Sequence, residues 1–321
     1  MLERKPDDAS ADRIERIAIV GAGVIGTGWA ARCLANGLNV VATDPAVRAE
    51  ERLRAGVANA WPALEKIGLA KGAEPERLEF CAKLEAAVSR ADFILEAAPE
   101  NEDIKRKLIA EIDANAAPHI VIASSSSGLL PSRIQADCRH PERVLIGHPF
   151  HPVYVLPILE IVGGEKTGAA AVRSAEAFFR SIGMRPLRLR TEIEGYLGNR
   201  IQEAVWREAL HLLADGVATT AEIDAAVRLG PGLRWGFMGP FLTFHMGGGE
   251  GGMEHVLEQF GPTLKLPWTK LEAPELTDEL RQRLIDGVRN QAAGHSTAEL
   301  ERRRDACLIE IQRVIAKHWP L

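Results

Sequence analysis

The chain has 321 residues, of which 46% are hydrophobic, and this length exceeds what one core usually organises, so we expect two domains. The net charge of −5 without a Lys/Arg-rich block argues against a nucleic-acid partner, and no apolar run approaches the ~20 residues of a membrane span. The four scattered cysteines lack a CxxC pair, and the polar N-terminus is unlike a signal peptide, which together predict a cytoplasmic protein with reduced thiols.

The first half alternates strand-like and helix-like segments. Residues 1–13 are highly polar and predict a disordered tail. Residues 14–20 then predict a buried strand, and residues 27–36 a helix that ends at Gly37. Further strands are expected at 38–43, 93–96, 120–123, 144–146 and 159–162, with helices at 102–114 and 168–182. This alternation predicts a Rossmann-type, doubly wound parallel sheet with helices on both faces, over residues 14–192.

The second half is helical in pattern. Helices are expected at 194–215, 220–229, after 239, and at 277–293 and 297–317. Thr219 with Glu222, and Ser296 with Glu299, have the spacing of capping boxes. We therefore expect a smaller all-helical domain at residues 193–321, with the active site between the two domains.

A glycine-rich turn follows the first strand. Gly21, Gly23 and Gly26 form G-x-G-x-x-G, with Val24 and Ile25 between the last two. The first glycine permits a tight turn, the second lets the backbone approach a pyrophosphate, and the third lets helix and strand pack closely. The following helix N-terminus supplies N–H groups and partial positive charge to the phosphates. Residues 21–26 therefore predict a dinucleotide site.

Asp44 ends the second predicted strand. A carboxylate there accepts hydrogen bonds from the ribose hydroxyls of NAD and repels the additional phosphate of NADP. The alternative is an aspartate that caps the next helix. NAD is the expected cofactor.

A histidine and a glutamate follow in the densest motif. Removal of a hydride from a carbinol carbon requires a base for the hydroxyl proton, and histidine titrates near neutral pH. Glu160 lies in the apolar run ILEIV, where an unpaired charge is costly, so we expect a partner and take His148 as that partner. The alternative is that His148 is a hydrogen-bonded core residue. Metal binding by His148 and His151 is disfavoured because no third ligand is nearby.

Six separated motifs, in their order, resemble the 3-hydroxyacyl-CoA dehydrogenase superfamily over essentially the full length. They are the glycine turn, a Glu-Ala-x-x-Glu-Asn segment, a serine-rich turn, a His-x-Phe-x-Pro motif, a linker ending in Asn-Arg and a Met-Gly-Pro-Phe loop. Their counterparts here are residues 21–26, 96–101, 124–127, 148–152, 194–200 and 238–241.

The resemblance implies roles for individual residues. The histidine of the family is the base and a glutamate twelve positions later orients it, as His148 and Glu160 are spaced here. A serine and an asparagine hydrogen-bond the reacting oxygen, which implies Ser127 and Asn199. Glu100, in the Glu-Asn segment, is expected to contact the cofactor. The alternatives are purely structural roles, in which Ser127 caps a turn and Asn199 caps a helix or bridges the domains.

Departures from the acyl-CoA pattern point to the substrate. Acidic Glu102 and Asp103 stand where acyl-CoA enzymes carry lysine, although Lys105 follows, and His151 replaces an asparagine. The surrounding segments look most like a branch of the superfamily that oxidises L-carnitine, with a gulonate-oxidising sister branch related to a lens crystallin.

The trimethylammonium group of carnitine cannot donate hydrogen bonds, so aromatic faces are suited to bind it. Trp235, Phe237 and Phe241 gather in a chain that is only 5% aromatic, and Tyr154 is a further candidate. The alternative is that these aromatic residues belong to the core or to a dimer interface.

The sequence thus predicts an NAD-dependent oxidoreductase acting on L-carnitine, a small-molecule substrate. The resemblance also implies a homodimer formed through the helical half. Gulonate and short 3-hydroxyacyl-CoA are the alternative substrates. An NAD-binding structural protein of the crystallin kind is the alternative that is not an enzyme.

Overall fold

The computed structural model describes residues 14–262, 266–270, 272, 274–275 and 277–318, so the tail predicted over residues 1–13 lies outside the described residues. The chain divides into two compact units, one ending at Leu197 and the other beginning at Gly198. Each unit is described by itself.

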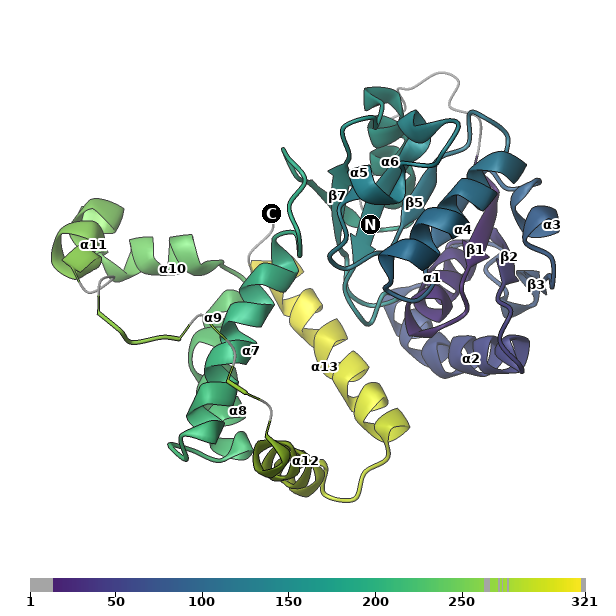
Figure 1. The fold of residues 1–321 in the computed structure, drawn as a ribbon. Coiled ribbons are helices and arrows are strands. Elements are labelled where there is room, and N and C mark those ends of the chain that lie inside the picture. The colour runs from purple at the N-terminus through teal and green to yellow at the C-terminus, as the bar shows by residue number, and fades with distance from the viewer. Residues whose placement is uncertain (1–13, 263–265, 271, 273, 276, 319–321) are drawn as a thin grey trace. The chain divides into compact units, whose positions relative to one another are not determined.

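The first unit is built on one eight-stranded sheet with the order β3-β2-β1-β4-β5-β6-β7-β8 (Figure 1). The strands are β1 (Arg16–Val20), β2 (Asn39–Thr43), β3 (Leu78–Phe80), β4 (Phe93–Glu96), β5 (Ile122–Ser124), β6 (Val144–Pro149), β7 (Ile158–Gly163) and β8 (Arg185–Arg188). The order reverses between β1 and β4, and ligands of such sheets bind at the carboxyl ends of the strands beside this point.

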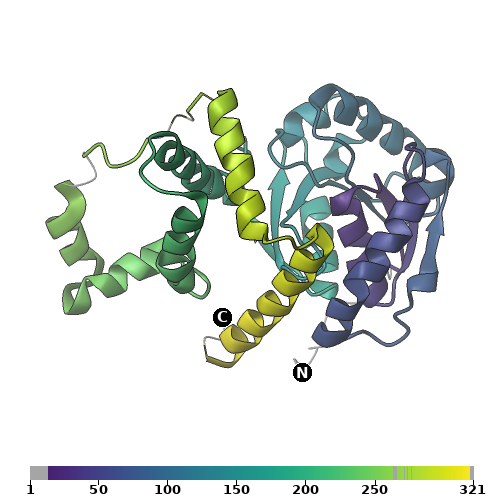
Figure 2. The same ribbon diagram turned by 90° about the horizontal axis from the view of Figure 1, so that it is seen from below.

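Helices cover both faces of this sheet (Figure 2). They are α1 (Val24–Ala35), α2 (Ala49–Ile67), α3 (Leu84–Val88), α4 (Glu102–Asn115), α5 (Pro131–Ile134) and α6 (Ala169–Ser181). Side chains of a strand point alternately to the two faces, so Ala18 and Val20 join a core with α3, α4 and α5. On the other face, Phe93 stacks on Phe178 of α6. The doubly wound Rossmann-type fold predicted from the sequence is confirmed.

Two strands depart from the expected parallel arrangement. β7 pairs with β6 in the antiparallel direction, and β8 runs parallel to β7, so both are opposite in direction to β6. The reason is the length of the connection, because residues 150–157 are too few for the crossover of about a dozen residues that a parallel pair needs. The antiparallel register places His148 directly opposite Glu160.

The second unit is helical, as predicted. Its helices are α7 (Gly198–Ala214), α8 (Thr220–Leu229), α9 (Pro231–Trp235), α10 (Pro240–Gly247), α11 (Gly252–Phe260), α12 (Asp278–Ala292) and α13 (Thr297–His318). Thr219 and Glu222 form the expected capping box, and the same reciprocal bonds join Ser296 and Glu299. Of the helices that the structure describes, none is both long and apolar enough to cross a membrane.

Candidate active site

The glycine-rich turn lies between β1 and α1, at the carboxyl edge of the sheet. Gly21 has φ +103°, and a Cβ there would lie 2.6 Å from the backbone of Ala97. A Cβ on Gly26 would lie 1.9 Å from the carbonyl oxygen of Gly21. These two glycines are therefore required by the packing of the protein itself.

Gly23 differs from the other two glycines. Among the residues that the structure describes, none has an atom within 4 Å of a Cβ placed here, and no side chain caps the N-terminus of α1, where Gly23 is the N-cap. The packing of the chain does not require a glycine here, whereas the close approach of a phosphate group would. The turn therefore fits the pyrophosphate of a dinucleotide, with the first amides of α1 as donors.

Asp44 follows β2 and binds two backbone amides. Its Oδ2 accepts from the N–H of Ala22 at 2.7 Å, and its Oδ1 accepts from the N–H of Ala46 at 2.8 Å. The N-cap of α2 is Arg48, so the alternative that Asp44 caps that helix is wrong. The carboxylate joins the glycine turn to the end of β2, where a ribose of NAD would be held.

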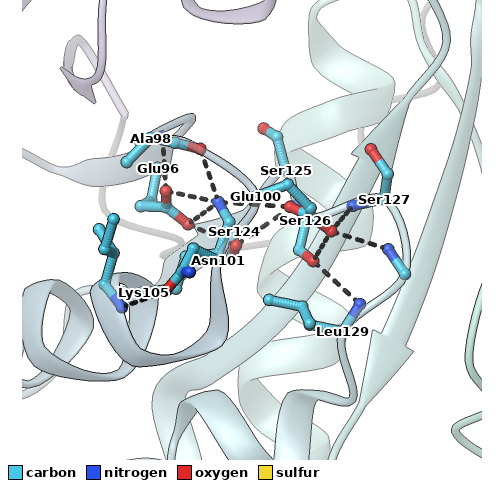
Figure 3. Close-up of polar contacts among 12 residues, drawn as sticks. Glu96, Ala98, Glu100, Asn101, Lys105, Ser124, Ser125, Ser126, Ser127 and Leu129 are labelled. Carbon is cyan, nitrogen blue, oxygen red and sulfur yellow. Dashed lines mark hydrogen bonds and ion pairs between the residues drawn. The ribbon is translucent and has the colours of Figure 1, made fainter.

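A buried ion pair joins the last residue of β4 to α4 (Figure 3). Lys105 and Glu96 have side chains only 1% and 0% exposed. The Nζ of Lys105 donates to both carboxylate oxygens of Glu96, at 2.7 and 3.0 Å, and to the carbonyl of Ala98 at 3.0 Å. Glu96 also accepts from the Ser124 hydroxyl at 2.5 Å. With every charge paired and hydrogen-bonded, this cluster fixes the ends of β4 and β5 to each other.

Glu100 holds the serine-rich turn (Figure 3). One oxygen, Oε1, accepts from the Ser126 hydroxyl at 2.7 Å and from the amides of Ser127 and Gly128 at 2.8 and 3.0 Å. The other oxygen lies 3.8 Å from the Nζ of Lys105. The Ser127 hydroxyl points away from Glu100. The Ser126 hydroxyl also caps the turn, since it accepts from the amide of Leu129 at 3.2 Å.

The predicted histidine–glutamate pair is present on β6 and β7. The Nδ1 of His148 and the Oε2 of Glu160 are 2.8 Å apart, and the side chains are 5% and 1% exposed. The other oxygen of Glu160 accepts from the amide of Leu197 at 2.9 Å. Because Nδ1 is engaged by the carboxylate, Nε2 is the nitrogen suited to exchange a proton with a substrate.

Two aromatic rings pack on His148. The ring centroid of Phe150 lies 4.9 Å away and that of Tyr196 lies 5.4 Å away. Tyr196 is buried, has φ +51°, and donates its hydroxyl to the carbonyl of Leu129 at 2.6 Å. Burial raises the pKa of this phenol, so it stays neutral and continues to donate. Tyr196 was not among the predicted site residues, although it lies in the linker motif.

The remaining candidates fall in separate places. Tyr154 is buried in the segment after β6, in the first unit. Asn199 is the second residue of α7 in the second unit, two residues after the amide that Glu160 binds. Trp235 ends α9 and Phe241 lies in α10, with Phe237 between these helices, and all three are exposed. Within the described part of the chain, no group of three or more potential ligands could hold a metal ion.

Comparison with known proteins identifies similar chains. The family models described as 3-hydroxyacyl-CoA dehydrogenase, NAD binding domain and C-terminal domain match residues 16–193 and 195–287. The L-carnitine dehydrogenase of Pseudomonas aeruginosa is 58% identical over 298 residues, which cover 93% of each chain. The L-carnitine dehydrogenase of Bacillus cereus is 55% identical over 307 residues, covering 96% of this chain and 94% of the relative.

A solved structure extends the likeness to three dimensions. The NAD⁺-dependent dismutase 5-formyl-3-hydroxy-2-methylpyridine 4-carboxylic acid 5-dehydrogenase superposes with a TM-score of 0.78 at 27% identity. The superposition covers 94% of this chain and 99% of that one.

Proposed function

The chain belongs to the 3-hydroxyacyl-CoA dehydrogenase family, and we propose that it is the NAD-dependent enzyme that oxidises the 3-hydroxyl of L-carnitine to 3-dehydrocarnitine. The observation that carries this proposal is its identity of 55–58% with two L-carnitine dehydrogenases over more than nine-tenths of each chain. The glycine turn and the buried His–Glu pair agree with that chemistry.

The cofactor would be held at the carboxyl edge of the sheet. Residues 21–26 bind the pyrophosphate, with the amides of Val24 and Ile25 among the donors, and Asp44 binds the ribose. Glu100 also contacts the cofactor in this proposal, through the oxygen that does not hold the serine turn. NAD, when bound, accepts the hydride.

Side chains of the protein accept the hydroxyl proton of the substrate. His148 takes the hydroxyl proton of the substrate at Nε2, while Glu160 keeps the other nitrogen protonated and stabilises the imidazolium that forms. The Ser127 hydroxyl and the Asn199 amide donate to the oxygen that changes from alcohol to ketone. The Glu100 bonds to the Ser127 and Gly128 amides support this role, because they fix the backbone that carries the hydroxyl.

The trimethylammonium group is assigned to aromatic side chains. Trp235, Phe237 and Phe241 offer ring faces, and Phe241 is 83% exposed in the described chain. Tyr154 is the candidate from the first unit. A cation over such rings is worth about 0.5–2 kcal/mol, so Trp235→Ala is expected to raise the KM for carnitine by roughly 2- to 30-fold.

The helical half has two further roles in this proposal. Residues 193–321 bind the substrate and form a homodimer, and residues 14–192 bind NAD. Two other exposed apolar side chains of α10, Phe244 and Met246, favour a surface that a second copy covers. We place the enzyme in the cytoplasm, acting without nucleic acid or membrane.

A substrate panel tests the function. NADH formation is measured with L-carnitine, gulonate and 3-hydroxybutyryl-CoA, each with NAD and with NADP. We expect turnover with L-carnitine and NAD, and a loss of about 10²–10⁴-fold in His148→Ala. Turnover of another alcohol but not of carnitine refutes the substrate, and NAD binding without any turnover favours the crystallin-like alternative.

A further inference from the structure

An arginine is buried in the helix that begins at the cofactor turn. Arg32 is 7% exposed and lies among apolar residues of α1. Its Nε donates to the carbonyl of Val153 at 2.7 Å, its Nη1 to that of Ile182 at 3.0 Å, and its Nη2 to that of Leu156 at 3.1 Å. Each of these three nitrogens therefore binds a different backbone carbonyl.

This arrangement is unusual for a buried charge. In the described part of the chain, the acceptors of Arg32 are all neutral carbonyls, whereas the buried Arg143 is paired with Asp113 at 2.6 Å. Burial lowers the pKa of Arg32 to about 10, so the guanidinium is still charged at neutral pH. Apolar side chains of similar volume usually pack at lower cost than buried charges, so packing alone does not account for Arg32. Its planar fork of donors is suited to several carbonyls at once.

Two of the three carbonyls that Arg32 binds belong to the segment that follows the proposed base, and the third, that of Ile182, lies at the C-cap of α6. Val153 and Leu156 lie on either side of Tyr154 and Val155, in the connection that leaves β6 after His148. One turn earlier on α1, a Cβ on Gly28 would lie 2.8 Å from the Cβ of Val153. Helix α1 and residues 152–156 are thus in close contact, and the arginine bonds hold them in one geometry.

The same turn of α1 also reaches the serine turn. The Nε1 of Trp29 donates to the hydroxyl of Ser125 at 2.9 Å, two residues before Ser127. The helix that starts at the glycine turn therefore touches both the segment that carries Tyr154 and the turn that carries Ser127. Arg32 makes the larger number of bonds, and all of them are to backbone.

We propose that Arg32 is a positioning residue for the reaction: it fixes residues 152–156, and with them Tyr154, to the helix of the cofactor turn. The inference rests on the proposed function, in which Tyr154 contacts the substrate and residues 21–26 bind NAD. Without Arg32, the substrate-side segment loses its fixed place relative to that helix, while the turn itself is unchanged.

Three variants test this role. Arg32→Met removes the donors and keeps much of the volume, and Arg32→Lys keeps the charge with fewer, differently directed donors. Arg77→Met is the matched control, because Arg77 also binds a carbonyl next to the C-terminal end of α1, but that carbonyl belongs to Gly37, at 3.2 Å, and not to residues 152–156. The measurements are kcat and KM for the alcohol and the dissociation constant of NAD. The alcohol is the one that the wild type oxidises, so a wrong substrate assignment does not decide the test.

We expect Arg32→Met to lower kcat/KM for the alcohol by about 10- to 100-fold, with the NAD dissociation constant within about twofold of wild type. Arg32→Lys should recover part of the loss, and Arg77→Met should keep wild-type kinetics. The proposal is overturned if Arg32→Met stays within about threefold of wild type, if NAD affinity falls in parallel, or if Arg77→Met loses as much. Should Arg32→Met fail to fold, kcat/KM for the alcohol and the NAD dissociation constant of Arg32→Lys decide between these outcomes.

Discussion

Replacing Glu160 by glutamine alters the chemistry of the His148–Glu160 pair, while the side chain at position 160 keeps almost the same shape. The two oxygens of Glu160 accept from His148 at 2.8 Å and from the amide of Leu197 at 2.9 Å. Glutamine offers one acceptor oxygen and one NH₂ donor. If the oxygen stays with Leu197, the NH₂ faces Nδ1, and the proton of the imidazole moves to Nε2. The nitrogen that should accept the substrate proton is then already protonated.

The expected loss is large in rate and small in stability. In serine proteases the comparable change from carboxylate to amide costs about 10⁴ in kcat, so we expect a fall of about 10³–10⁴ here, or roughly 4–5.5 kcal/mol in the barrier. The free energy of unfolding changes less, because a lost charge-assisted hydrogen bond, about 1.5–3 kcal/mol, is offset by no longer burying a charge.

The assay is NADH formation with L-carnitine, run beside an NAD titration and a urea denaturation curve. Glu192→Gln is the control, because Glu192 also accepts from a backbone amide, that of Ser132 at 3.0 Å, without contacting an imidazole. A Glu160→Gln enzyme that keeps wild-type kcat would refute the assignment of His148 as an oriented base. So would an equal loss in the control.

Three further predictions follow from the local geometry. Gly26→Ala should lower the free energy of unfolding by about 3 kcal/mol, because the added Cβ would lie 1.9 Å from a backbone oxygen. Gly23→Ala, by contrast, should keep the thermal stability of the wild type and weaken NAD binding in a titration. Thr219→Ala should cost about 1 kcal/mol in urea denaturation, because it removes the hydroxyl that caps α8. Burial raises the pKa of Cys33 to about 12, so at neutral pH this thiol should be alkylated only after unfolding, as peptide mapping would show.

The sequence was sufficient where a local pattern fixes the structure. The glycine turn could be placed because a strand precedes it and a helix follows, and the structure adds that Gly23 alone of its three glycines has open space beside it. The partner of Glu160 could be inferred because a carboxylate in an apolar strand needs one, and His148 lies 2.8 Å away. In both cases the chemistry of one or two residues limits the structures that the segment can adopt and the partners that it can have.

The sequence was insufficient where partners lie far apart along the chain. Arg32 donates hydrogen bonds to carbonyls that are 121, 124 and 150 residues away. Because every residue carries a backbone carbonyl, no residue type in the sequence identifies these acceptors. The only signal was a charge within an apolar helix. The direction of β7 could not be predicted from its apolar residues, because the same run of residues forms a parallel or an antiparallel strand. The signal that was present is the connection of eight residues between β6 and β7, which is too short for a crossover.

The proposed base and the proposed oxygen donor depend on different kinds of support. His148 and Glu160 oppose each other in an antiparallel ladder, and a shift of one residue in that register would turn Glu160 to the other face of the sheet. The backbone hydrogen bonds of β6 and β7 therefore set this pair. Ser127 lies beyond the end of β5, where no ladder holds it, and Glu100 supplies the bonds instead. The base is thus fixed by the ladder of the sheet, whereas the backbone of the serine is fixed by hydrogen bonds to the Glu100 side chain.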